Sequence, residues 1–376
     1  MSEHPFIAQD TDIRRIWQAD LHAVGCLECG AVYLVPTDKG GARCFACLSE
    51  TLEAQPARLR PEAPEMMVPY AADLDATQLS RGFAQWLRGT WFRPDDMQVE
   101  RLVTRLERVV VPMWLVDGQV VGVWQARMGY DYQVESAQER FIDGKGWTTQ
   151  HLRETRIRWE PRAGRVRRSY ENLAVSALEE RERAVFQTRL GHYDLERATP
   201  YIPENMAGMS VRVPSLLPDE AWPDARTAFD SAAAADCRRG AGAQHHAEFE
   251  LIADYEKLHW TQMLLPAFVT YYQDDAGHLF PVWVNGQSGR VNGVRRASMR
   301  KAWRIAGGAA AVALVTFFAG ALAALLSAGS VSSLLLAASF FLLVVAALPV
   351  LWAWQFNTQQ AYTSRSPDKS VVKLGH

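Results

Sequence analysis

Two apolar runs near the C-terminus, IAGGAAAVALVTFFAGALAALL (residues 305–326) and LLLAASFFLLVVAALPVLWAW (residues 334–354), decide the architecture of the chain. They contain 22 and 21 residues, none of them charged. A helix rises about 1.5 Å per residue and the hydrocarbon core of a bilayer is about 30 Å thick, so each run can cross once. Small residues (327–333) separate the runs. The pattern predicts a two-helix transmembrane hairpin over residues 301–356; the alternative is a buried hairpin in a soluble protein.

The residues that flank the hairpin predict its orientation. Basic side chains precede and follow it: Arg295, Arg296, Arg300, Lys301, Arg304, Arg365, Lys369 and Lys373. Because Lys and Arg close to a span are retained in the cytoplasm, we expect both termini and the soluble part on that side. Trp303, Trp352 and Trp354 suit the membrane interface, where an indole ring lies half in lipid and half in water. The N-terminus has no apolar signal stretch, which agrees with this topology.

Composition sets limits on the soluble part of the chain. The 376 residues carry a net charge of −2, so no global basic field draws the protein to nucleic acid. About 300 residues lie outside the hairpin, enough for two domains or one large one. Four of the five cysteines form two close pairs. In a reducing cytoplasm such pairs indicate metal ligands rather than disulfides.

The cysteine pairs form the clearest motif in the soluble part. Cys26 and Cys29 belong to CLECG, and Cys44 and Cys47 belong to CFAC. Two CxxC pairs at this separation predict a zinc ribbon, in which four thiolates close a tetrahedral site around structural Zn²⁺. Gly30 follows the first pair, where the backbone needs a residue tolerant of positive φ. Iron in a rubredoxin-like site and a redox role are the alternatives.

The remaining pattern predicts an α+β fold with an antiparallel β-rich middle. We expect a zinc ribbon over residues 1–50, a Pro-rich linker over 51–72, an α+β domain over 73–300, the hairpin, and a cytoplasmic tail over 357–376. Helices are predicted within residues 73–106, 177–190 and 219–236, the last with an exposed, flexible end. Asp117-Gly118 and the ArgAlaGly sequence at 162–164 are predicted turns. The similarity of residues 264–269 to 110–115 suggests a duplicated β unit.

These features together resemble a bacterial family of membrane-anchored proteins with a transcription factor IIB-type zinc ribbon. The resemblance rests on the four cysteines, LLP (residues 264–266), VNGQSG (residues 284–289) and the hairpin that follows. Ser288 departs from the Thr more common in the family. Members are often labelled primosomal protein or replication factor Y helicase-like. The resemblance implies instead a non-enzymatic component of the bacterial inner membrane, found with stress-response coat proteins and SPFH-domain scaffolds.

The helicase label finds no support in the motifs. A nucleotide motor needs GxxxxGK[ST], and Gly144-Lys145-Gly146 lacks both the leading glycine and the Ser or Thr. The acidic pair Asp219-Glu220 follows Pro218, where acidic residues are expected at a helix N-terminus. Neither GxSxG nor HExxH occurs. We therefore expect no enzyme and no catalytic residues.

Three further features have functional and structural interpretations. The arginines at 153, 156, 158, 162, 165, 167 and 168 fit lipid headgroups or nucleic-acid phosphate, but also a solvated strand face. His245 and His246 are neighbours that point apart, which favours a surface role over metal binding. Cys237 lies beside Asp236 and two arginines, which suggests a lowered thiol pKa.

The sequence thus predicts a membrane-anchored scaffold or adaptor with a ribbon, a mixed α+β middle and a two-helix hairpin. Its expected partners are membrane lipid and proteins of the coat or SPFH type, or a related zinc-ribbon membrane protein. We expect a homo- or hetero-oligomer and no nucleic acid. The alternative is a membrane-tethered DNA-binding factor linked to replication or transcription.

Overall fold

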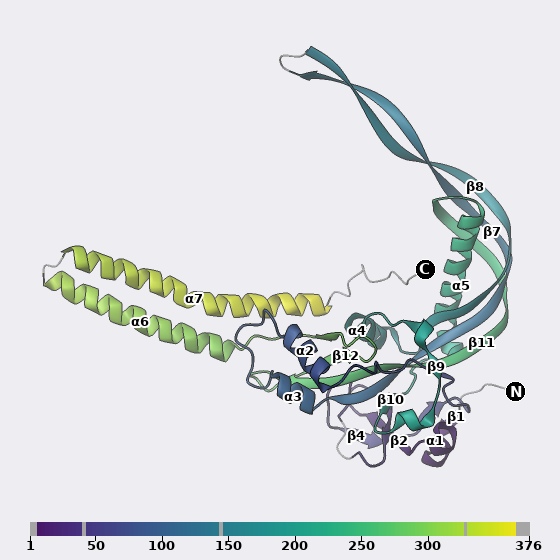
Figure 1. The fold of residues 1–376 in the computed structure, drawn as a ribbon, viewed down its shortest axis with the longest axis horizontal. Helices are drawn as coiled ribbons and strands as arrows, with labels where there is room; N and C mark the ends of the chain where they lie inside the picture. Colours follow the sequence, from purple (N-terminus) through teal and green to yellow (C-terminus); the bar gives the residue numbers. More distant parts are fainter. Residues whose placement is uncertain (1–5, 40–42, 143–145, 327–328, 366–376) are drawn as a thin grey trace. The chain divides into compact units, whose positions relative to one another are not determined.

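The computed structural model describes residues 6–39, 43–142, 146–326 and 329–365 (Figure 1). The chain forms two compact units. Unit 1 comprises Met1–Pro112, Leu178–Ser215 and Leu264–His376, and unit 2 comprises Met113–Ala177 and Leu216–Met263. Strands β7 and β11 contribute to both units. Several residues named above lie outside the described parts of the chain: Gly144, Lys145, residues 327–328 of the predicted turn, Lys369 and Lys373.

Unit 1 is built on a mixed sheet that carries the cysteine motif at one end. Its strands follow the order β13-β12-β11-β7-β10-β3-β2-β4. The bounds are β2 Leu21–Cys26, β3 Val32–Pro36, β4 Leu52–Ala54, β7 Glu107–Ile142, β10 Ser210–Arg212, β11 His245–Gln273, β12 Leu279–Asn285 and β13 Val291–Gly293. Strand β10 lies antiparallel to β3 but parallel to β7. The predicted α+β class is confirmed, with this parallel pair as an exception to the antiparallel pattern.

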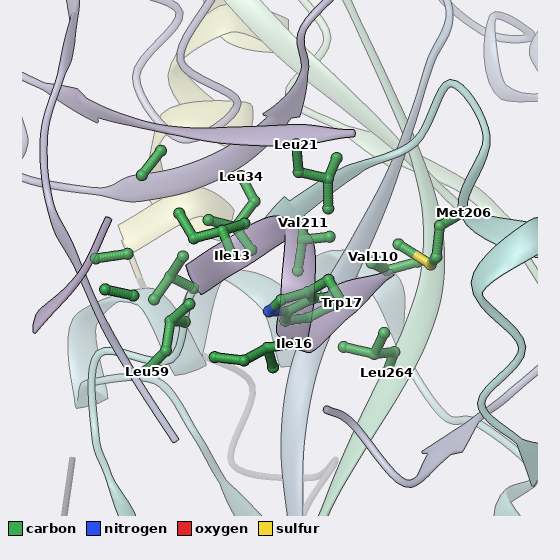
Figure 2. Close-up of a cluster of buried hydrophobic side chains, with 14 of the residues drawn as sticks. Ile13, Ile16, Trp17, Leu21, Leu34, Leu59, Val110, Met206, Val211 and Leu264 are labelled. Carbon is green, nitrogen blue, oxygen red and sulfur yellow. The ribbon is translucent and has the colours of Figure 1, made fainter. Parts of the chain in front are cut away.

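One face of this sheet packs on helix α1 (Asp10–Trp17). Ile13 and Trp17 of α1 are buried against Leu34, Val110 and Val211 from three different strands (Figure 2). The hydroxyl of Tyr201 donates a hydrogen bond to the Trp17 carbonyl at 2.8 Å. Burial of apolar side chains stabilises a fold by about 25 cal/mol per Å². This core therefore joins the strands next to the cysteine motif to the centre of the sheet.

The Pro-rich segment 51–72 is not the linker that composition predicted. It contributes β4, which pairs with β2, and β5 (Ala57–Leu59), which pairs with β1 (Phe6–Ala8). It also contains β6 (Met66–Met67), paired with β9 (Thr199–Pro200). The prolines at 56, 61 and 64 stand between these short strands, where the missing N–H removes no ladder bond. Proline content therefore marked the strand ends rather than an unfolded connection.

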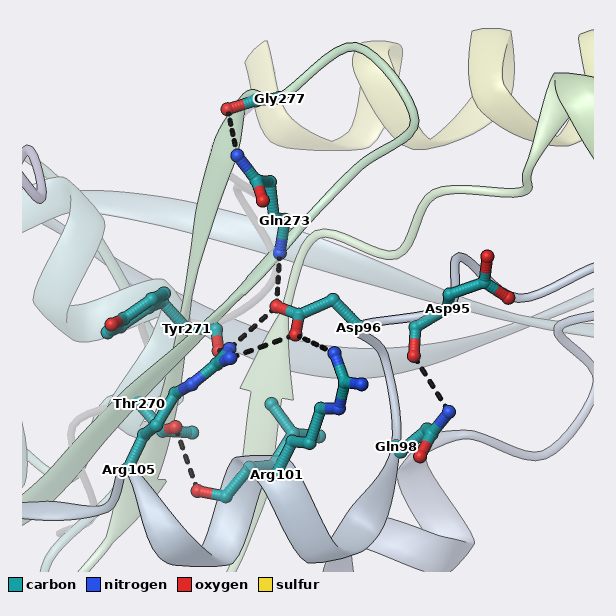
Figure 3. A network of polar contacts seen from close by, with 10 residues as sticks. Asp95, Asp96, Gln98, Arg101, Arg105, Thr270, Tyr271, Gln273 and Gly277 are labelled. Carbon is teal, nitrogen blue, oxygen red and sulfur yellow. Dashed lines mark hydrogen bonds and ion pairs between the residues drawn. The ribbon is translucent and has the colours of Figure 1, made fainter.

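The predicted helices of unit 1 are present in shorter form, as α2 Ala76–Trp86, α3 Val99–Thr104 and α4 Glu180–Leu190. Two 3₁₀ turns that were not predicted, η1 Leu195–Arg197 and η2 Pro203–Met206, follow α4. Asp75 caps α2 by accepting a hydrogen bond from the Gln78 amide. Between α2 and α3, the Asp96 carboxylate accepts hydrogen bonds from Arg101, Arg105 and the Gln273 amide (Figure 3). This network ties the helical segment to β11.

Unit 2 is a three-stranded sheet with one helix. Strand β8 (Gly146–Ser176) pairs antiparallel with β7, β11 lies on the other side of β7, and α5 (Pro218–Gly240) packs against the sheet (Figure 1). Trp114, Val120, Phe229 and Trp260 are in the core. Helix α5 buries small and aromatic residues at a spacing of four, namely Ala221, Ala225, Phe229, Ala233 and Cys237. The helix is confirmed. The predicted exposure is wrong for the alanine run, where Ala233 and Ala234 are buried against the sheet, and right for Arg239 and Gly240 at the helix end.

The two predicted turns of unit 2 are also wrong. Strand β7 continues through Asp117-Gly118 with only a register shift, and Asp117 accepts a hydrogen bond from the Asn172 amide at 2.6 Å. Gly164 lies within β8 opposite Trp124. A Cβ at Gly164 would come within 3.1 Å of the Trp124 ring. Gly118 therefore lies at a β-bulge, and Gly164 allows a close packing contact with Trp124; neither forms a hairpin turn.

The C-terminal helices pack along each other as a hairpin. They are α6 (Met299–Leu325) and α7 (Gly329–Arg365). Both are long and apolar enough to cross a membrane, and only 11% of the most apolar window of each is buried, far from the burial of a soluble core. A Cβ at Gly320 would lie 3.0 Å from Leu335, so this glycine permits close helix approach. Residues 329–333 of the predicted turn (327–333) and residues 357–365 of the predicted tail (357–376) are helical parts of α7. Residues 110–115 and 264–269 lie on β7 and β11, and the duplication remains a prediction.

Candidate metal centre and membrane anchor

The two cysteine pairs lie in backbone turns of the same pattern. In the first, the Gly30 amide donates to the Cys26 carbonyl at 2.9 Å and the Cys26 amide donates to the Ala31 carbonyl at 2.9 Å. In the second, the Leu48 amide donates to the Cys44 carbonyl at 2.8 Å and the Cys44 amide to Ser49 at 2.9 Å. Gly30 and Leu48 both have positive φ, 73° and 64°. The expectation for Gly30 is confirmed.

This backbone geometry gathers the four sulfurs into one cluster. The Sγ atoms of Cys26 and Cys47 are 3.5 Å apart, as are those of Cys29 and Cys44, and all four lie within 4.8 Å of one another. Tetrahedral thiolate coordination with bonds of about 2.3 Å puts sulfurs about 3.8 Å apart. All four cysteines are free thiols, well beyond the disulfide distance of about 2.05 Å. They are positioned to bind a metal ion.

The inner side of the cluster contacts buried polar groups that the sequence did not reveal. The Tyr33 hydroxyl lies 3.6 Å from Cys44 Sγ, and the Tyr33 ring packs edge-on against Phe45. The guanidinium of Arg212 lies 5.5 Å from the Tyr33 ring centroid. Arg212 donates to the Val32 carbonyl at 3.0 Å and forms an ion pair with Glu182. Four thiolates around one divalent ion would form a dianion, which the Tyr33 hydroxyl would stabilise by donating a hydrogen bond to Cys44, with the Arg212–Glu182 pair behind the ring.

The outer side of the cluster is open to solvent and flanked by cations. Cys29 and Cys47 are exposed, whereas Cys26 and Cys44 are buried. Lys39 forms an ion pair with Glu107 at 2.7 Å, and its ammonium lies 6.0 Å from the Phe45 ring centroid. Arg43 donates to the Leu48 carbonyl at 3.3 Å, in the second turn itself. Arg43 also forms an ion pair with Glu50, so both cations beside the exposed side of the cluster are paired with carboxylates. The four ligands leave the site closed to substrate.

The thiols differ in their electrostatic surroundings. Burial raises the pKa of Cys47 to about 11 and raises that of Cys29 further. Burial also opposes the thiolate of Cys26, but donation from the backbone amides of Cys29 and Glu28 lowers its pKa. A bound cation must displace protons from the other thiols, so metal affinity falls as pH falls.

The base of the hairpin contacts the globular part of unit 1 through a loop that the sequence reasoning missed. The ring of Trp91 stacks on Trp352 of α7, with centroids 5.4 Å apart and planes at 24°. The ammonium of Lys301 pairs with Asp95 at 2.7 Å, and Asp275 accepts from the Ser298 hydroxyl at 2.7 Å. Trp303 and Trp354, which the sequence places at the interface, are each 62% exposed. Trp91 lies between α2 and α3, within the stretch 73–106 where the pattern predicted helices, and its aromatic character was the one available signal.

The other candidate residues are not brought to the cysteine cluster. His245 pairs with Asp131 at 2.8 Å, and His246 packs near Phe249. Burial and the neighbouring Asp236 raise the pKa of the Cys237 thiol, so the lowered pKa suggested by its arginines is wrong. The arginines of β8 are exposed, and five of them pair with acidic groups: Arg153, Arg156, Arg158, Arg162 and Arg168. These residues form no metal or catalytic cluster within the described parts of the chain.

Comparison with known proteins gives no assignment. No family model, no curated protein and no solved structure matches the chain.

Proposed function

We propose that this chain is a non-enzymatic scaffold or adaptor, anchored in the bacterial inner membrane by α6 and α7, that organises partner proteins at the cytoplasmic face. The resemblance to the zinc-ribbon membrane family suggests membrane-stress coat or SPFH-type proteins as partners, or a related zinc-ribbon membrane protein. The basic residues around the hairpin favour the cytoplasmic orientation of the soluble part.

The observation that carries this proposal is the two-stranded ribbon at the far end of β7 and β8. Beyond the pair Asp131–Ile157, the two strands remain paired as far as Ile142 and Gly146. Strand β11 begins at His245, which contacts Asp131, so among the described residues this ribbon has no third strand. Figure 1 shows it extending past α5 within unit 2. A two-stranded ribbon is only marginally stable in water, and an extended one gains from a partner that covers it.

The described side chains of the ribbon suit protein contact better than a phosphate backbone. Tyr132, Leu152 and Ile157 are large apolar residues that are 38–45% exposed. The arginines among them are offset by acids: Arg153 pairs with Glu135 at 2.7 Å and Arg156 with Glu154 at 3.2 Å. Exposed aromatic and aliphatic groups between such charges are typical of protein interfaces.

In this proposal the cysteine cluster holds zinc in a structural role. The ligands are Cys26, Cys29, Cys44 and Cys47, and four protein ligands leave no open position for water or substrate. The metal would hold the two turns together, with the ion-paired side chains of Lys39 and Arg43 beside them. Iron is the alternative ion for the same ligands.

A second candidate function is DNA binding at the membrane. It is favoured by Arg165 and Arg167, which are exposed and have no acidic partner in the described portion of the chain. Such binding would weaken by decades as salt rises, because counterions are released from phosphate.

Removal of the ribbon tests the scaffold directly. Asp131 and Ile157 face each other in register, so residues 132–156 can be replaced by Asn-Gly, which forms a tight two-residue turn. The shortened protein should retain membrane insertion and metal content but lose co-purifying proteins. A second variant substitutes only Tyr132→Ser and Ile157→Thr; it leaves the backbone ribbon intact and should also recover less partner, because it removes exposed apolar contacts. If the shortened protein co-purifies with the same proteins in the same amounts as wild type, the proposal is wrong.

A further inference from the structure

The sheet of unit 2 has two unlike outer edges. Strand β8 forms one edge because it pairs only with β7, and the part of β11 that lies in unit 2 forms the other. Within the described residues, no further strand pairs with either edge in this unit. Unpaired N–H and C=O groups along a strand are a template for another strand. Each edge is therefore able to continue the sheet.

The two edges carry opposite charge. Strand β8 holds seven arginines and three glutamates. From His245 to Met263, β11 holds four acidic residues, Glu248, Glu250, Asp254 and Glu256, and one lysine. The sheet is thus basic along one edge and acidic along the other.

Part of this charge has no partner within the unit. Glu248 pairs with Arg127 at 3.3 Å, and Glu250 accepts a hydrogen bond from Gln125, so both engage β7. Asp254 and Glu256 are exposed and have no basic partner among the residues described. The same holds for Arg165 and Arg167 on β8.

The four unpaired charges lie on one face of the sheet. Arg165 and Arg167 are opposite Val123 and Val121 of β7, residues that alternate with the core residues Val120 and Ala126. On β11, Phe249, Leu251, Ala253 and Tyr255 pack on the core, which leaves Asp254 and Glu256 on the outer face. Ile252, between them and Glu250, is 78% exposed. An apolar group flanked by unpaired charge is what a strand-pairing partner would cover.

The backbone sets the length of the acidic edge. Glu248 and Lys257 adopt left-handed φ values of 52° and 54°. Such residues interrupt the regular ladder, so the regular edge runs from residue 249 to 256. On β8, the corresponding irregularity is Asn172, with φ of 55°, and the strand from residue 154 to 169 is regular.

We propose that copies of this chain associate through these unlike edges, the β8 edge of one copy pairing with the β11 edge of the next. A second copy is the occupant because one sheet carries both complementary charges. The basic β8 edge of each copy matches the acidic β11 edge of the next copy. Repetition of an unlike contact forms a ring or an open row rather than a closed twofold dimer.

Charge reversal tests the pairing. Variant one carries Arg165→Glu and Arg167→Glu; variant two carries Asp254→Arg and Glu256→Arg. Like charges then face each other in each pure variant, and association of the full-length protein in detergent should weaken at least tenfold. Analytical ultracentrifugation over a concentration series, without nucleic acid or lipid, measures this. The control Arg81→Glu with Arg88→Glu removes the same positive charge from exposed positions in unit 1.

Mixing the variants separates lost contact from lost folding. In an equimolar mixture, the acidic β8 edge of variant one can pair with the basic β11 edge of variant two. The native basic β8 edge of variant two can pair with the native acidic β11 edge of variant one. Association should return to within about threefold of wild type, and a single chain with all four substitutions should behave likewise. The proposal is overturned if the pure variants assemble as wild type does, if neither combination restores assembly, or if wild type associates only after DNA or anionic vesicles are added.

Discussion

Leu48 occupies in the second cysteine turn the position that Gly30 occupies in the first, with φ of 64° against 73° and the same amide-to-carbonyl bond four residues back. Left-handed backbone is costly for residues with a Cβ, by about 1 kcal/mol or more. At Gly30 a Cβ would meet no atom within 4 Å, so backbone strain alone decides how a substitution there changes the stability of the protein.

The first prediction concerns that strain. Gly30→Ala should destabilise the loaded protein by about 1 kcal/mol, and Gly30→Val by more, because a β-branched side chain fits the left-handed region least well. Thermal melting in detergent measures the difference. Equal melting temperatures for wild type, alanine and valine would contradict the strained-turn account.

Each ligand cysteine should be needed for metal binding. Cys26→Ser, Cys29→Ser, Cys44→Ser and Cys47→Ser should each lower bound metal from about one ion per chain towards zero, because a serine hydroxyl is a poor ligand for a thiolate site. Cys237→Ser, the matched control, should keep the ion because Cys237 lies in α5 of unit 2. Elemental analysis of the purified protein gives metal identity and stoichiometry together. Iron in place of zinc would correct the proposed ion.

Tyr33 should tune the affinity of the site. Tyr33→Phe removes the hydroxyl 3.6 Å from Cys44 Sγ while keeping the ring against Phe45. Loss of a hydrogen bond to a metal ligand commonly weakens binding about tenfold or more. Competition for Zn²⁺ against a chromophoric chelator measures the change, with Tyr132→Phe on the ribbon as the control. Identical affinities would mean that the hydroxyl only packs.

The Asp96 network should make the free energy of unfolding depend on pH in the acidic range. Although burial disfavours its charged form, hydrogen bonds from Arg105 and Arg101 lower the pKa of Asp96 from 3.8 to about 2. A depressed folded pKa gives stability that is present above pH 3.8 and is lost as pH falls towards 2. Asp96→Asn should cost about 1.5–3 kcal/mol at pH 7 and less near pH 3. Melting of both proteins across pH 3 to 7 measures this; a gap independent of pH would contradict it.

Substitution by alanine at two glycines of unit 2 should change the stability of the protein in opposite directions. Gly164→Ala places a Cβ 3.1 Å from the Trp124 ring, and overpacking of this kind costs about 1–3 kcal/mol. Gly240→Ala meets no atom within 4 Å at the end of α5 and should be neutral or stabilise by up to about 1 kcal/mol. Melting temperatures distinguish the pair. If Gly164→Ala were also neutral, residue 164 would need no close approach.

The parts of the fold that the sequence predicted are those governed by local chemistry. The Cys26 and Cys44 motifs, the left-handed Gly30 and the two apolar helices follow from spacing and length alone. The positions of Tyr33 and Arg212 beside the cysteine cluster were not predicted, because a buried tyrosine and an ordinary arginine have no sequence signature. Arg212 reaches the site only through tertiary packing.

The errors arose where a local signal competed with packing. Asp117-Gly118 and Gly164 have turn chemistry, yet long β7 and β8 pair straight through both. The alanines of α5 suggested exposure, but small residues let the helix lie close to the sheet. In each case burial against a distant segment outweighed the local preference.

The most direct test of the central claim is a mild-detergent affinity purification from native membranes, with bound proteins, nucleic acid and metal quantified at low and high salt. The account predicts about one zinc ion per chain and protein partners that remain bound at high salt, with no stoichiometric nucleic acid. DNA or replication proteins that are recovered in stoichiometric amounts at low salt and lost at high salt would contradict it.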